Sequence, residues 1–435
     1  MQFVSTRNKN HAVSLDKAIL FGAAPDGGLY MPTRLPTFVP GQFRGLITLP
    51  EIAERLLQPF FRGSVLERYL GKLCERTFSF PVPLEELDQT RPNVFMLELF
   101  HGPTASFKDF GARFLAGCLT IIHRQSTRPL TILVATSGDT GGAAAAAFRS
   151  NPKFKVVILY PETGVTDRQR QLMTCWGGNV KAVAVEGDFD DCQRLVKAAF
   201  ADRKLRATYG LTSANSINIG RLLPQMAYHV AACLRPWRRH ARSPTFVIPT
   251  GNLGNALACI WVRKMGLPIA EIILATNANR TIPDFLSDGH WRPRESIPTL
   301  ASAMDVGNPS NMERLQQFTG SIAATRQEIQ AFSVSDEQIR QELVHHAKRY
   351  GKIWCPHTAC ALHVQYELSE SMAPDTPWVV TATAHPSKFE TIIEPLIRDE
   401  VEVPEQTQKL LALPSQSTSI EPDLKSLQAI LAGSD

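Results

Sequence analysis

This 435-residue sequence has no long apolar run and no leader-like start. No segment approaches the roughly 18 to 20 consecutive apolar residues that a membrane-spanning helix needs, so we expect no membrane partner. The first residues, MQFVSTRNKNHAVSLDKAIL, lack a basic segment followed by an apolar one, and we therefore expect no signal peptide. Together these absences predict a cytoplasmic protein.

Closely spaced cysteine pairs are also missing. The chain has 8 cysteines but no CxxC pair, and several of them lie in apolar segments. This pattern predicts buried free thiols in a reducing compartment. Cys355 and Cys360 flank His357 in CPHTAC, a zinc-like arrangement, but no second ligand pair follows it. We therefore expect no metal site.

Two common phosphate-binding signatures do not occur. There is no GxxxxGK[ST] motif, and no GxGxxG joins a strand to a helix. Internal repeats and extended low-complexity tracts are missing too. The sequence therefore lacks the familiar marks of P-loop proteins, of dinucleotide-binding folds and of repeat proteins.

What the chain does have is the composition of an ordinary globular protein. Hydrophobic residues make up 44% and charged residues 20%, and the formal net charge is +5. This balance predicts a large core, and the length predicts about two or three domains. The basic cluster RPWRRHAR (235–242) is a stretch that could contact nucleic acid, but its shortness favours a solvated loop between a helix and a strand. We expect no nucleic-acid partner.

The first part of the chain differs from the rest. It contains the turn-rich APDGGLYMP (24–32), the proline-rich TRLPTFVPG (33–41) and a helical pattern from Glu51 to Cys74. The segment FPVP (80–83) then interrupts the pattern. We predict a small N-terminal domain over residues 1–82 and a core over residues 83–435.

Short apolar segments alternate with helical ones in the core. They are rich in Val, Ile and Thr and nearly continuous in apolar character, as strands buried on both faces should be. We predict strands at LTILVATS (130–137), KVVILYP (155–161), VKAVAVEG (180–187), TFVIPTG (245–251), IILATN (272–277) and WVVTATA (378–384), with helices such as 188–202 and 217–234 between them. This alternation predicts an α/β fold with doubly wound, mostly parallel sheets. The polar tail from about residue 403 is expected to be a surface appendage.

One lysine has an unusual place in HGPTASFKDFGARFLAGCL (101–119). Ser106 and Asp109 form a capping-box pattern, so we expect a helix that begins at about Phe107 and has Lys108 in its first turn. The positive end of the helix dipole and the aromatic neighbours both lower the pKa of this lysine. The neutral amine favoured in this way is a nucleophile suited to forming a Schiff base. The alternative is a lysine that extends to water beside Asp109.

Two glycine-rich turns each join a predicted strand to a helix. They lie in TILVATSGDTGGAAAAAF (131–148) and TFVIPTGNLGNALACIWV (245–262). Glycines permit positive φ, and free N–H groups at a helix start bind phosphate or carboxylate. Either turn alone is equally consistent with an ordinary strand–helix connection. Both turns together with the lysine favour pyridoxal phosphate, with one turn for the cofactor phosphate and the other for a substrate carboxylate.

A third segment, SANSINIGRLL (213–223), places hydrogen-bond donors at the start of a helix. Asn215 and Ser216 supply polar side chains, and the guanidinium of Arg221 has the geometry to bind a phosphate through two N–H groups. The alternative is a capped helix with a solvated arginine.

The motifs HGPTASFKDFG, TSGDTGGAA, SANSINIGR, GNLGN and TAHPSKF (383–389), in this order, resemble the threonine synthase family, and the match covers nearly the whole chain. The stretch GGLYMP near the start is similar to the N-terminal domain of one branch of that family. The resemblance implies a fold-type-II pyridoxal-phosphate enzyme like the tryptophan synthase β chain, with two α/β lobes of which the smaller covers roughly residues 110–215.

The resemblance also implies an activity, the last step of threonine biosynthesis. O-Phospho-L-homoserine and water become L-threonine and phosphate through elimination of phosphate from the γ-carbon and addition of water at the β-carbon. A second enzymatic reading is a phospho-lyase that releases its intermediate before water adds and so forms 2-oxobutyrate, phosphate and ammonia. We expect a monomer or a homodimer.

Each residue that matches the family motifs then has an implied role. Lys108 would carry the cofactor and act as both base and acid, which requires a pKa near the working pH. The remaining cofactor contacts would come from Gly251, Asn252, Leu253 and Asn255 at the phosphate and from Thr383 at the pyridine nitrogen. The substrate contacts would come from Asn215, Ser216 and Arg221 at its phosphate and from Ser137 and Thr140 at its carboxylate.

Some positions depart from the family pattern. Ala105-Ser106 replaces a Leu-Ala pair before FKDFG, and Arg280 and Asp284 reverse an expected charge pair, to which we assign no catalytic role. Asp139 stands where many related enzymes carry an asparagine beside the 3′-oxygen of the cofactor. A carboxylate would repel that oxygen, so the sequence does not identify the hydrogen-bond partner of the 3′-oxygen; Asn215 is a candidate.

Overall fold

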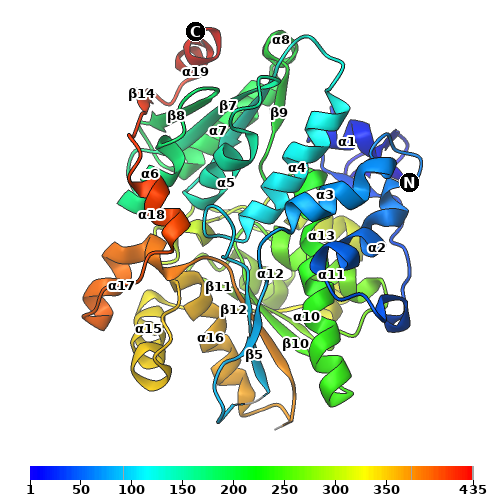
Figure 1. Cartoon of the computed structure of the whole chain (residues 1–435), viewed down its shortest axis with the longest axis vertical. Coiled ribbons are helices and arrows are strands. Elements are labelled where there is room, and N and C mark those ends of the chain that lie inside the picture. The colour runs from blue at the N-terminus through cyan, green and yellow to red at the C-terminus, as the bar shows by residue number, and fades with distance from the viewer. Residues whose placement is uncertain (92, 374, 434–435) are drawn as a thin grey trace.

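The computed structural model describes residues 1–91, 93–373 and 375–433, and these residues form three sheets (Figure 1). The first sheet is three-stranded and antiparallel, in the order β2-β1-β3. Its strands are β1 (Gln2–Ser5), β2 (Ala12–Ser14) and β3 (Tyr30–Pro32). The helical elements of this part are α1 (Leu15–Phe21), η1 (Pro40–Phe43), α2 (Leu49–Phe61), η2 (Glu67–Tyr69) and α3 (Leu70–Thr77).

The helical pattern predicted from Glu51 to Cys74 is two helices rather than one. Helix α2 begins where Thr48 and Glu51 form a capping box, and it ends at Phe61. Gly63 has a φ of 80°, a left-handed conformation that a right-handed helix does not accommodate. The chain therefore turns before η2 and α3.

The larger sheet is six-stranded, in the order β12-β11-β10-β13-β5-β4. All of its pairs are parallel except the pair of β4 with β5. The strands are β4 (Leu84–Glu86), β5 (Val94–Glu98), β10 (Thr245–Pro249), β11 (Ile272–Thr276), β12 (Gln330–Ser333) and β13 (Trp378–Ala382). The helical elements around it are α10 (Gln225–His240), α11 (Gly254–Lys264), α12 (Thr281–Asp288), η3 (Ser302–Met304), α13 (Met312–Thr319), α14 (Ile322–Glu328), α15 (Asp336–Tyr350), α16 (Pro356–Ser369), η4 (Pro386–Phe389) and α17 (Glu390–Ile397).

The smaller sheet is five-stranded and wholly parallel, in the order β14-β8-β7-β6-β9. Its strands are β6 (Leu130–Ala135), β7 (Phe154–Pro161), β8 (Val180–Val185), β9 (Leu211–Ser213) and β14 (Thr418–Ile420). Its helices are α4 (Lys108–Ile122), α5 (Asp139–Phe148), α6 (Asp167–Thr174), α7 (Phe189–Ala201), α8 (Arg203–Tyr209) and α9 (Ile219–Leu222). Figure 1 shows this sheet in the upper half and the larger sheet in the lower half.

Each predicted strand of the core is confirmed, as is the parallel α/β fold. Every residue of β6, β10, β11 and β13 is buried, because helices cover both faces of these strands. One continuous apolar core joins Phe3 of β1, Phe60 of α2 and Phe114 of α4 to Ile158 of β7 and Trp261 of α11. The N-terminal residues therefore pack directly on the core; the domain boundary at residue 82 stays a prediction.

The prediction that the tail is a surface appendage is wrong. After α18 (Glu405–Leu411), strand β14 pairs in parallel with β8, and α19 (Leu424–Ala432) packs against α7. Ile420, Leu427 and Leu431 are buried there. The few apolar residues of a polar segment thus complete the edge of the smaller sheet.

The basic cluster at 235–242 is also different from its prediction, since residues 235–240 form the last turns of α10 instead of a loop. Its arginines bond within the chain: Arg235 to the Leu84 carbonyl, Arg238 to the Phe43 carbonyl, Arg239 to Glu86 and Arg242 to Asp375. Arg280 and Asp284 form the local charge pair that their sequence suggested, with 2.8 Å between Nε and Oδ1.

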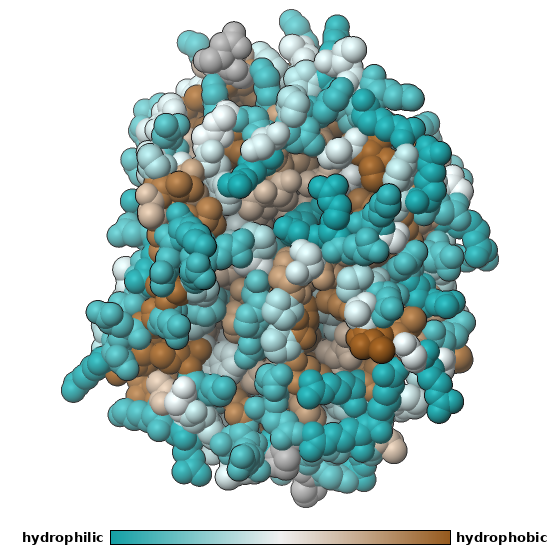
Figure 2. Space-filling model, viewed as in Figure 1, coloured by the Kyte–Doolittle hydropathy of each residue, from teal (hydrophilic) through white to brown (hydrophobic). Residues whose placement is uncertain are grey.

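The surface carries no broad apolar band on the face that Figure 2 shows, only separate apolar patches among hydrophilic residues. Within the described ranges, no helix combines the length and the apolar character needed to cross a membrane. All the cysteines are free and buried, which confirms that prediction. In the described part of the chain no cluster of three or more His, Cys, Asp or Glu side chains is placed to hold a metal ion.

Candidate active site

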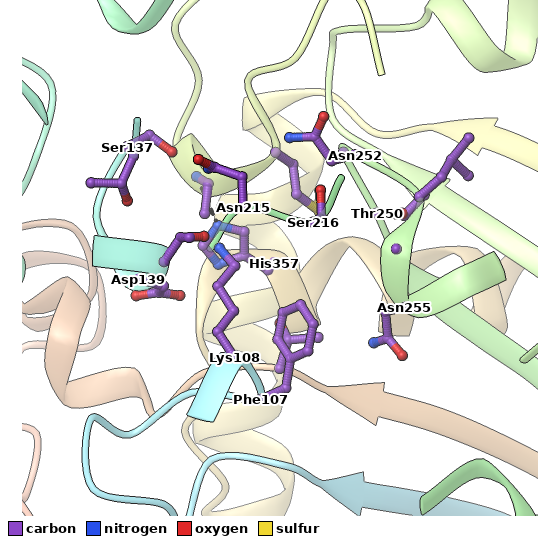
Figure 3. Close-up of a pocket in the computed structure, with 18 of the residues that line it drawn as sticks. Phe107, Lys108, Ser137, Asp139, Asn215, Ser216, Thr250, Asn252, Asn255 and His357 are labelled. Carbon is purple, nitrogen blue, oxygen red and sulfur yellow. Dashed lines mark hydrogen bonds between the residues drawn. The ribbon is translucent and has the colours of Figure 1, made fainter. Parts of the chain in front are cut away.

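The carboxyl ends of both parallel sheets open onto one cavity, the usual place for a ligand in such folds. Residues of the turns that follow β6, β9, β10 and β13 line it, together with the start of α4. In Figure 3 the side chain of Lys108 extends between the turn that carries Ser137 and the turn that carries Asn252. The structure brings every predicted site residue to this cavity: Lys108, Ser137, Thr140, Asn215, Ser216, Arg221, Gly251, Asn252, Leu253, Asn255 and Thr383.

Lys108 is the first residue of α4, but the predicted capping box is absent. Phe107 is the residue before the helix, and no side chain caps it. Asp109 instead accepts hydrogen bonds from the N–H (2.9 Å) and the hydroxyl (2.8 Å) of Thr104, and the hydroxyl of Ser106 is buried without a partner. Asp109 is also buried, so the alternative in which Lys108 extends to the outer surface beside Asp109 is wrong. Lys108 is partly exposed, and it lines the cavity instead.

The amine of Lys108 has the lowered pKa that the sequence predicted. The pKa of Lys108 is lowered to about 8, mainly by burial; the carboxylate of Asp139 opposes this shift, and the nearby cations Lys388 and Arg221 add to it. The Nζ atom lies 5.7 Å from the centre of the Phe107 ring. Near neutral pH this lysine is therefore partly present as the free amine.

The turn between β10 and α11 presents a row of unused backbone donors. No described residue accepts a hydrogen bond from the N–H groups of residues 251–256. The prediction placed the positive φ on a glycine, but it belongs to Leu253, with a φ of 62°. Gly251 serves close packing instead, since a Cβ there would lie 2.9 Å from the Cα of Met304. Unused N–H groups at a helix start are suited to binding an anion.

The turn between β6 and α5 is a second such site. Gly138 has a φ of 136°, and the hydroxyl of Thr136 accepts from the N–H groups of Gly138 and Gly141, both at 3.0 Å. No described acceptor takes the N–H groups of Ser137, Asp139 or Thr140. The three residues that carry these donors all line the cavity.

The third segment is held differently from its prediction. The side-chain amide of Asn215 is bound to the backbone of Ala135, donating at 2.7 Å and accepting at 3.3 Å. Arg221 is buried, and its terminal nitrogens donate to the carbonyls of Ala214 and of Lys108. The solvated-arginine alternative is thus wrong. One N–H of each terminal nitrogen is already engaged, and the remaining guanidinium N–H groups bond to no described residue. Burial lowers the pKa of Arg221 to about 10, and its Nε is buried without a partner.

Two side chains that the sequence analysis did not assign also belong to this site. Lys388 of the TAHPSKF motif forms a buried ion pair with Asp139, with 2.5 Å between Nζ and Oδ1. His357, the residue considered above as a zinc ligand, lines the cavity. Its Nε2 accepts the N–H of Ala303 at 3.1 Å, and its Nδ1 is buried without a partner. The motif in which Lys388 lies was the signal available for it; nothing in CPHTAC pointed to this cavity.

The imidazole of His357 is neutral at physiological pH. Burial lowers its pKa to about 4, against the attraction of Asp139. Because Nε2 accepts a hydrogen bond, the proton of the neutral ring lies on Nδ1. His357 therefore offers a hydrogen-bond donor that no described residue uses.

A buried arginine connects the site to the N-terminal sheet. Arg314 of α13 donates to the carbonyl of Tyr30 in β3 at 2.9 Å and to those of Ser216 and Ile217 at 3.2 and 2.5 Å. Its neighbour Asn311 donates to the carbonyl of Asn252 at 3.0 Å. The N-terminal residues thus support two of the segments that line the cavity.

The fold and the site together define a class of protein. The profile of the family described as "Pyridoxal-phosphate dependent enzyme" matches residues 77–384. The paired parallel sheets around a partly buried lysine are those of fold-type-II enzymes of this class, and the chain is one of them.

More specific similarities identify the family within that class. Profiles described as "Threonine synthase N terminus" and "Threonine synthase, C-terminal" match residues 2–78 and 358–431. Threonine synthase of Buchnera aphidicola subsp. Schizaphis graminum is 35% identical over 433 residues, 99% of each chain. The crystal structure of threonine synthase from Escherichia coli is 36% identical, with a TM-score of 0.92 and coverage of 100% of both chains. That of the PLP-bound enzyme from Brucella melitensis is 32% identical, with a TM-score of 0.89 and coverage of 100% of this chain and 99% of that one. The chain belongs to the threonine synthase family and is a pyridoxal-phosphate-dependent lyase.

Proposed function

We propose that this enzyme converts O-phospho-L-homoserine and water into L-threonine and phosphate. The observation that carries the proposal is the position of Lys108, whose amine lies between two turns that each present unused N–H groups. A cofactor phosphate and a substrate carboxylate are the two anions that such a pair of turns fits. Family membership supports the same reaction.

The residues present fit pyridoxal phosphate. The free N–H groups of residues 251–256 suit its phosphate, and the side chain of Asn255, whose Nδ2 is buried without a partner, lies in the same turn. The buried Thr383 follows β13 directly, and its hydroxyl, which bonds to no described residue, would meet the pyridine nitrogen. Lys108 would hold the aldehyde carbon. When bound, the cofactor supplies an electron sink for the bonds next to the substrate's amino-bearing carbon.

Lys108 then serves as the group that moves protons. Its pKa of about 8 means that the charged and neutral forms are both populated near neutral pH. A single residue that takes a proton from one carbon and returns it to another needs this balance. Asp109, bonded to Thr104, is held away from this task.

The substrate has two anionic groups, and the cavity has a place for each. The N–H groups of Ser137 and Thr140, with the side chains of the same residues, would bind the carboxylate. Asn215, Ser216 and Arg221 would bind the phosphate. Because each terminal nitrogen of Arg221 already donates one N–H to a backbone carbonyl, we propose that it acts through its charge and its remaining N–H groups, that of Nε included.

His357 adds an uncharged donor to the same cavity. Its Nδ1–H has no acceptor among the described residues, and a buried donor without an acceptor is costly in a folded protein. We propose that a bound ligand supplies that acceptor.

We also propose that the enzyme works in the cytoplasm as a monomer or a homodimer. The buried free thiols suit a reducing compartment. Sedimentation of the purified protein distinguishes the two assembly states, and a third state contradicts this part of the proposal.

Product analysis tests the reaction. Purified holoenzyme given O-phospho-L-homoserine should release L-threonine and phosphate in equal amounts. Formation of 2-oxobutyrate and ammonia with the phosphate would identify the phospho-lyase instead. The Lys108→Ala variant is the control, since it keeps both turns but lacks the amine and should form neither product.

A further inference from the structure

A buried ion pair connects the two parallel sheets beside the cavity. Asp139 is the first residue of α5 on the smaller sheet, and Lys388 lies in η4, which follows β13 of the larger sheet. The Nζ and Oδ1 atoms are 2.5 Å apart. Asp139 is 4% exposed and Lys388 is 1% exposed, so neither charge is solvated.

Both partners are held by further hydrogen bonds. The Nζ of Lys388 donates to the carbonyl of Thr104 at 2.8 Å, and its own carbonyl accepts the hydroxyl of Thr166 at 2.6 Å. Gln169 donates to Oδ1 of Asp139 at 3.5 Å. Lys388 therefore contacts the loop before Lys108, the start of α6 and the start of α5 at once.

The pair lies next to the amine that the proposed function requires. Four charged or titratable groups act on Lys108: Asp139 from α5, Lys388 from η4, Arg221 from α9 and His357 from α16. His357 is neutral, as its lowered pKa shows. Burial works to raise the pKa of Asp139, but the charges of Lys388 and Lys108 hold it well below its usual range, so the carboxylate is ionised.

An ionised Asp139 without its partner would work against the site in two ways. It would attract a proton to Lys108, which must give its proton up. It would also repel an anion at the free N–H groups of Ser137 and Thr140, which flank it in the same turn. Lys388 cancels both effects because its charge lies 2.5 Å from the carboxylate.

We propose that Lys388 is a positioning residue that forms a neutral pair with Asp139 and so allows an acidic residue to stand in the anion-binding turn beside Lys108. The proposal rests on the proposed function, since it takes Lys108 as the cofactor-bearing residue. It also explains how a carboxylate can stand at residue 139, where related enzymes carry an asparagine: the charge of Lys388 compensates that of Asp139.

A purely structural pair makes a different prediction. Buried ion pairs contribute little to stability compared with apolar residues of the same size, but removal of one partner is strongly destabilising. A structural role would therefore change the thermal midpoint of the single variants and leave the titration of the bound cofactor unmoved.

The test uses the holoenzyme with Lys388→Met, Asp139→Asn and the double variant. The Lys409→Met variant is a matched control, since Lys409 pairs with Glu405 on the exposed surface of α18. The readout is the pH midpoint at which the visible absorption of the bound cofactor changes. We expect the midpoint to rise by about one pH unit in Lys388→Met and to fall by about one unit in Asp139→Asn. The midpoint of the double variant should lie close to that of the wild type, and the midpoint of Lys409→Met should equal it.

Steady-state kinetics give a second readout. An uncompensated carboxylate in the turn should raise the KM for O-phospho-L-homoserine at least about tenfold in Lys388→Met. Lys388→Arg, which keeps the charge, should restore most of the loss. If Lys388→Met does not fold, two results still test the proposal. The pH midpoint should fall in Asp139→Asn, and it should lie close to that of the wild type in the double variant.

Midpoints that stay unchanged in all three variants, or that move in the same direction in both single variants, overturn the proposal. Borohydride reduction followed by peptide mapping keeps this failure separate from failure of the proposed function. If the cofactor is fixed on Lys108 and the midpoints do not move, only the role of Lys388 is wrong. If the wild type fixes no cofactor on Lys108, the proposed function itself is wrong.

Discussion

The N–H of Phe107 donates a hydrogen bond of 2.9 Å to the carbonyl oxygen of Thr383. A bridge between Ser106 and Ala384 continues this contact. The residue before Lys108 is thus joined to the proposed partner of the pyridine nitrogen, although the two lie in motifs far apart in the sequence. These backbone contacts would fix the residue that holds the aldehyde carbon of the cofactor relative to the residue that meets its pyridine nitrogen.

The turn at 251–256 should be sensitive to a single methyl group. Gly251→Ala places a Cβ 2.9 Å from the Cα of Met304, so the turn must move and its N–H groups lose their alignment. We expect the Kd for pyridoxal phosphate to rise about tenfold or more, measured by absorption titration of the cofactor-free protein. Gly41→Ala is the control, because a Cβ there meets open space. Equal affinity in the two variants would contradict a phosphate site at this turn.

The rate at which cofactor-free protein recaptures pyridoxal phosphate should depend on pH through Lys108. The neutral amine is the nucleophile, and its pKa is lowered by burial to about 8. The rate should therefore rise with pH and reach half of its maximum near pH 8. Stopped-flow absorption measures it. A rate that is still rising steeply above about pH 10, as for an ordinary exposed lysine, would show that the amine is not perturbed.

His357 should affect ligand binding through its Nδ1–H. In His357→Gln the side-chain carbonyl can still accept the N–H of Ala303, but the donor at Nδ1 is lost. We expect weaker binding of substrate or cofactor by about tenfold, with a thermal midpoint close to that of the wild type. Binding and KM measured together check this. Unchanged values for both ligands would mean that Nδ1 meets no ligand group.

The C-terminal strand should contribute to stability. Ile420 is 8% exposed in β14, which pairs with β8 at Val185. Ile420→Ala should lower the free energy of unfolding by about 2 kcal/mol, because it removes buried methyl groups from the edge of the smaller sheet. Leu413→Ala, at an exposed position, should change it by less than about 0.5 kcal/mol. Urea denaturation compares the two, and equal stability would mean that β14 is not part of the folded core.

The sequence was most informative where a segment is buried on both faces. In β6 and β13 a short apolar run rich in Val, Ile and Thr favours a strand, and the strands were predicted within a few residues. The glycine turns were recognised because a strand and a helix flank each of them. Lys108 was recognised because its neighbours in the sequence are also its neighbours in space.

Contacts between distant segments were beyond such reasoning. The ion pair of Asp139 with Lys388 joins residues on different sheets, and no local pattern specifies it. His357 faces the cavity because α16, the helix that carries it, packs against β10 and β13. In the sequence the same histidine stood out only as part of the zinc-like CPHTAC. The capping box predicted at Ser106 is wrong because Asp109 accepts hydrogen bonds from Thr104 instead, which the turn before the helix brings close. The positive φ at Leu253 is imposed by the fold against the local preference of a leucine.

Borohydride reduction of the holoenzyme, followed by peptide mapping, tests the role of Lys108 directly. We predict that the pyridoxyl group is fixed on Lys108 and that Lys108→Ala protein, treated in the same way, carries none. Attachment to another lysine, Lys388 included, or no attachment in the wild type, would contradict the mechanism proposed for this site.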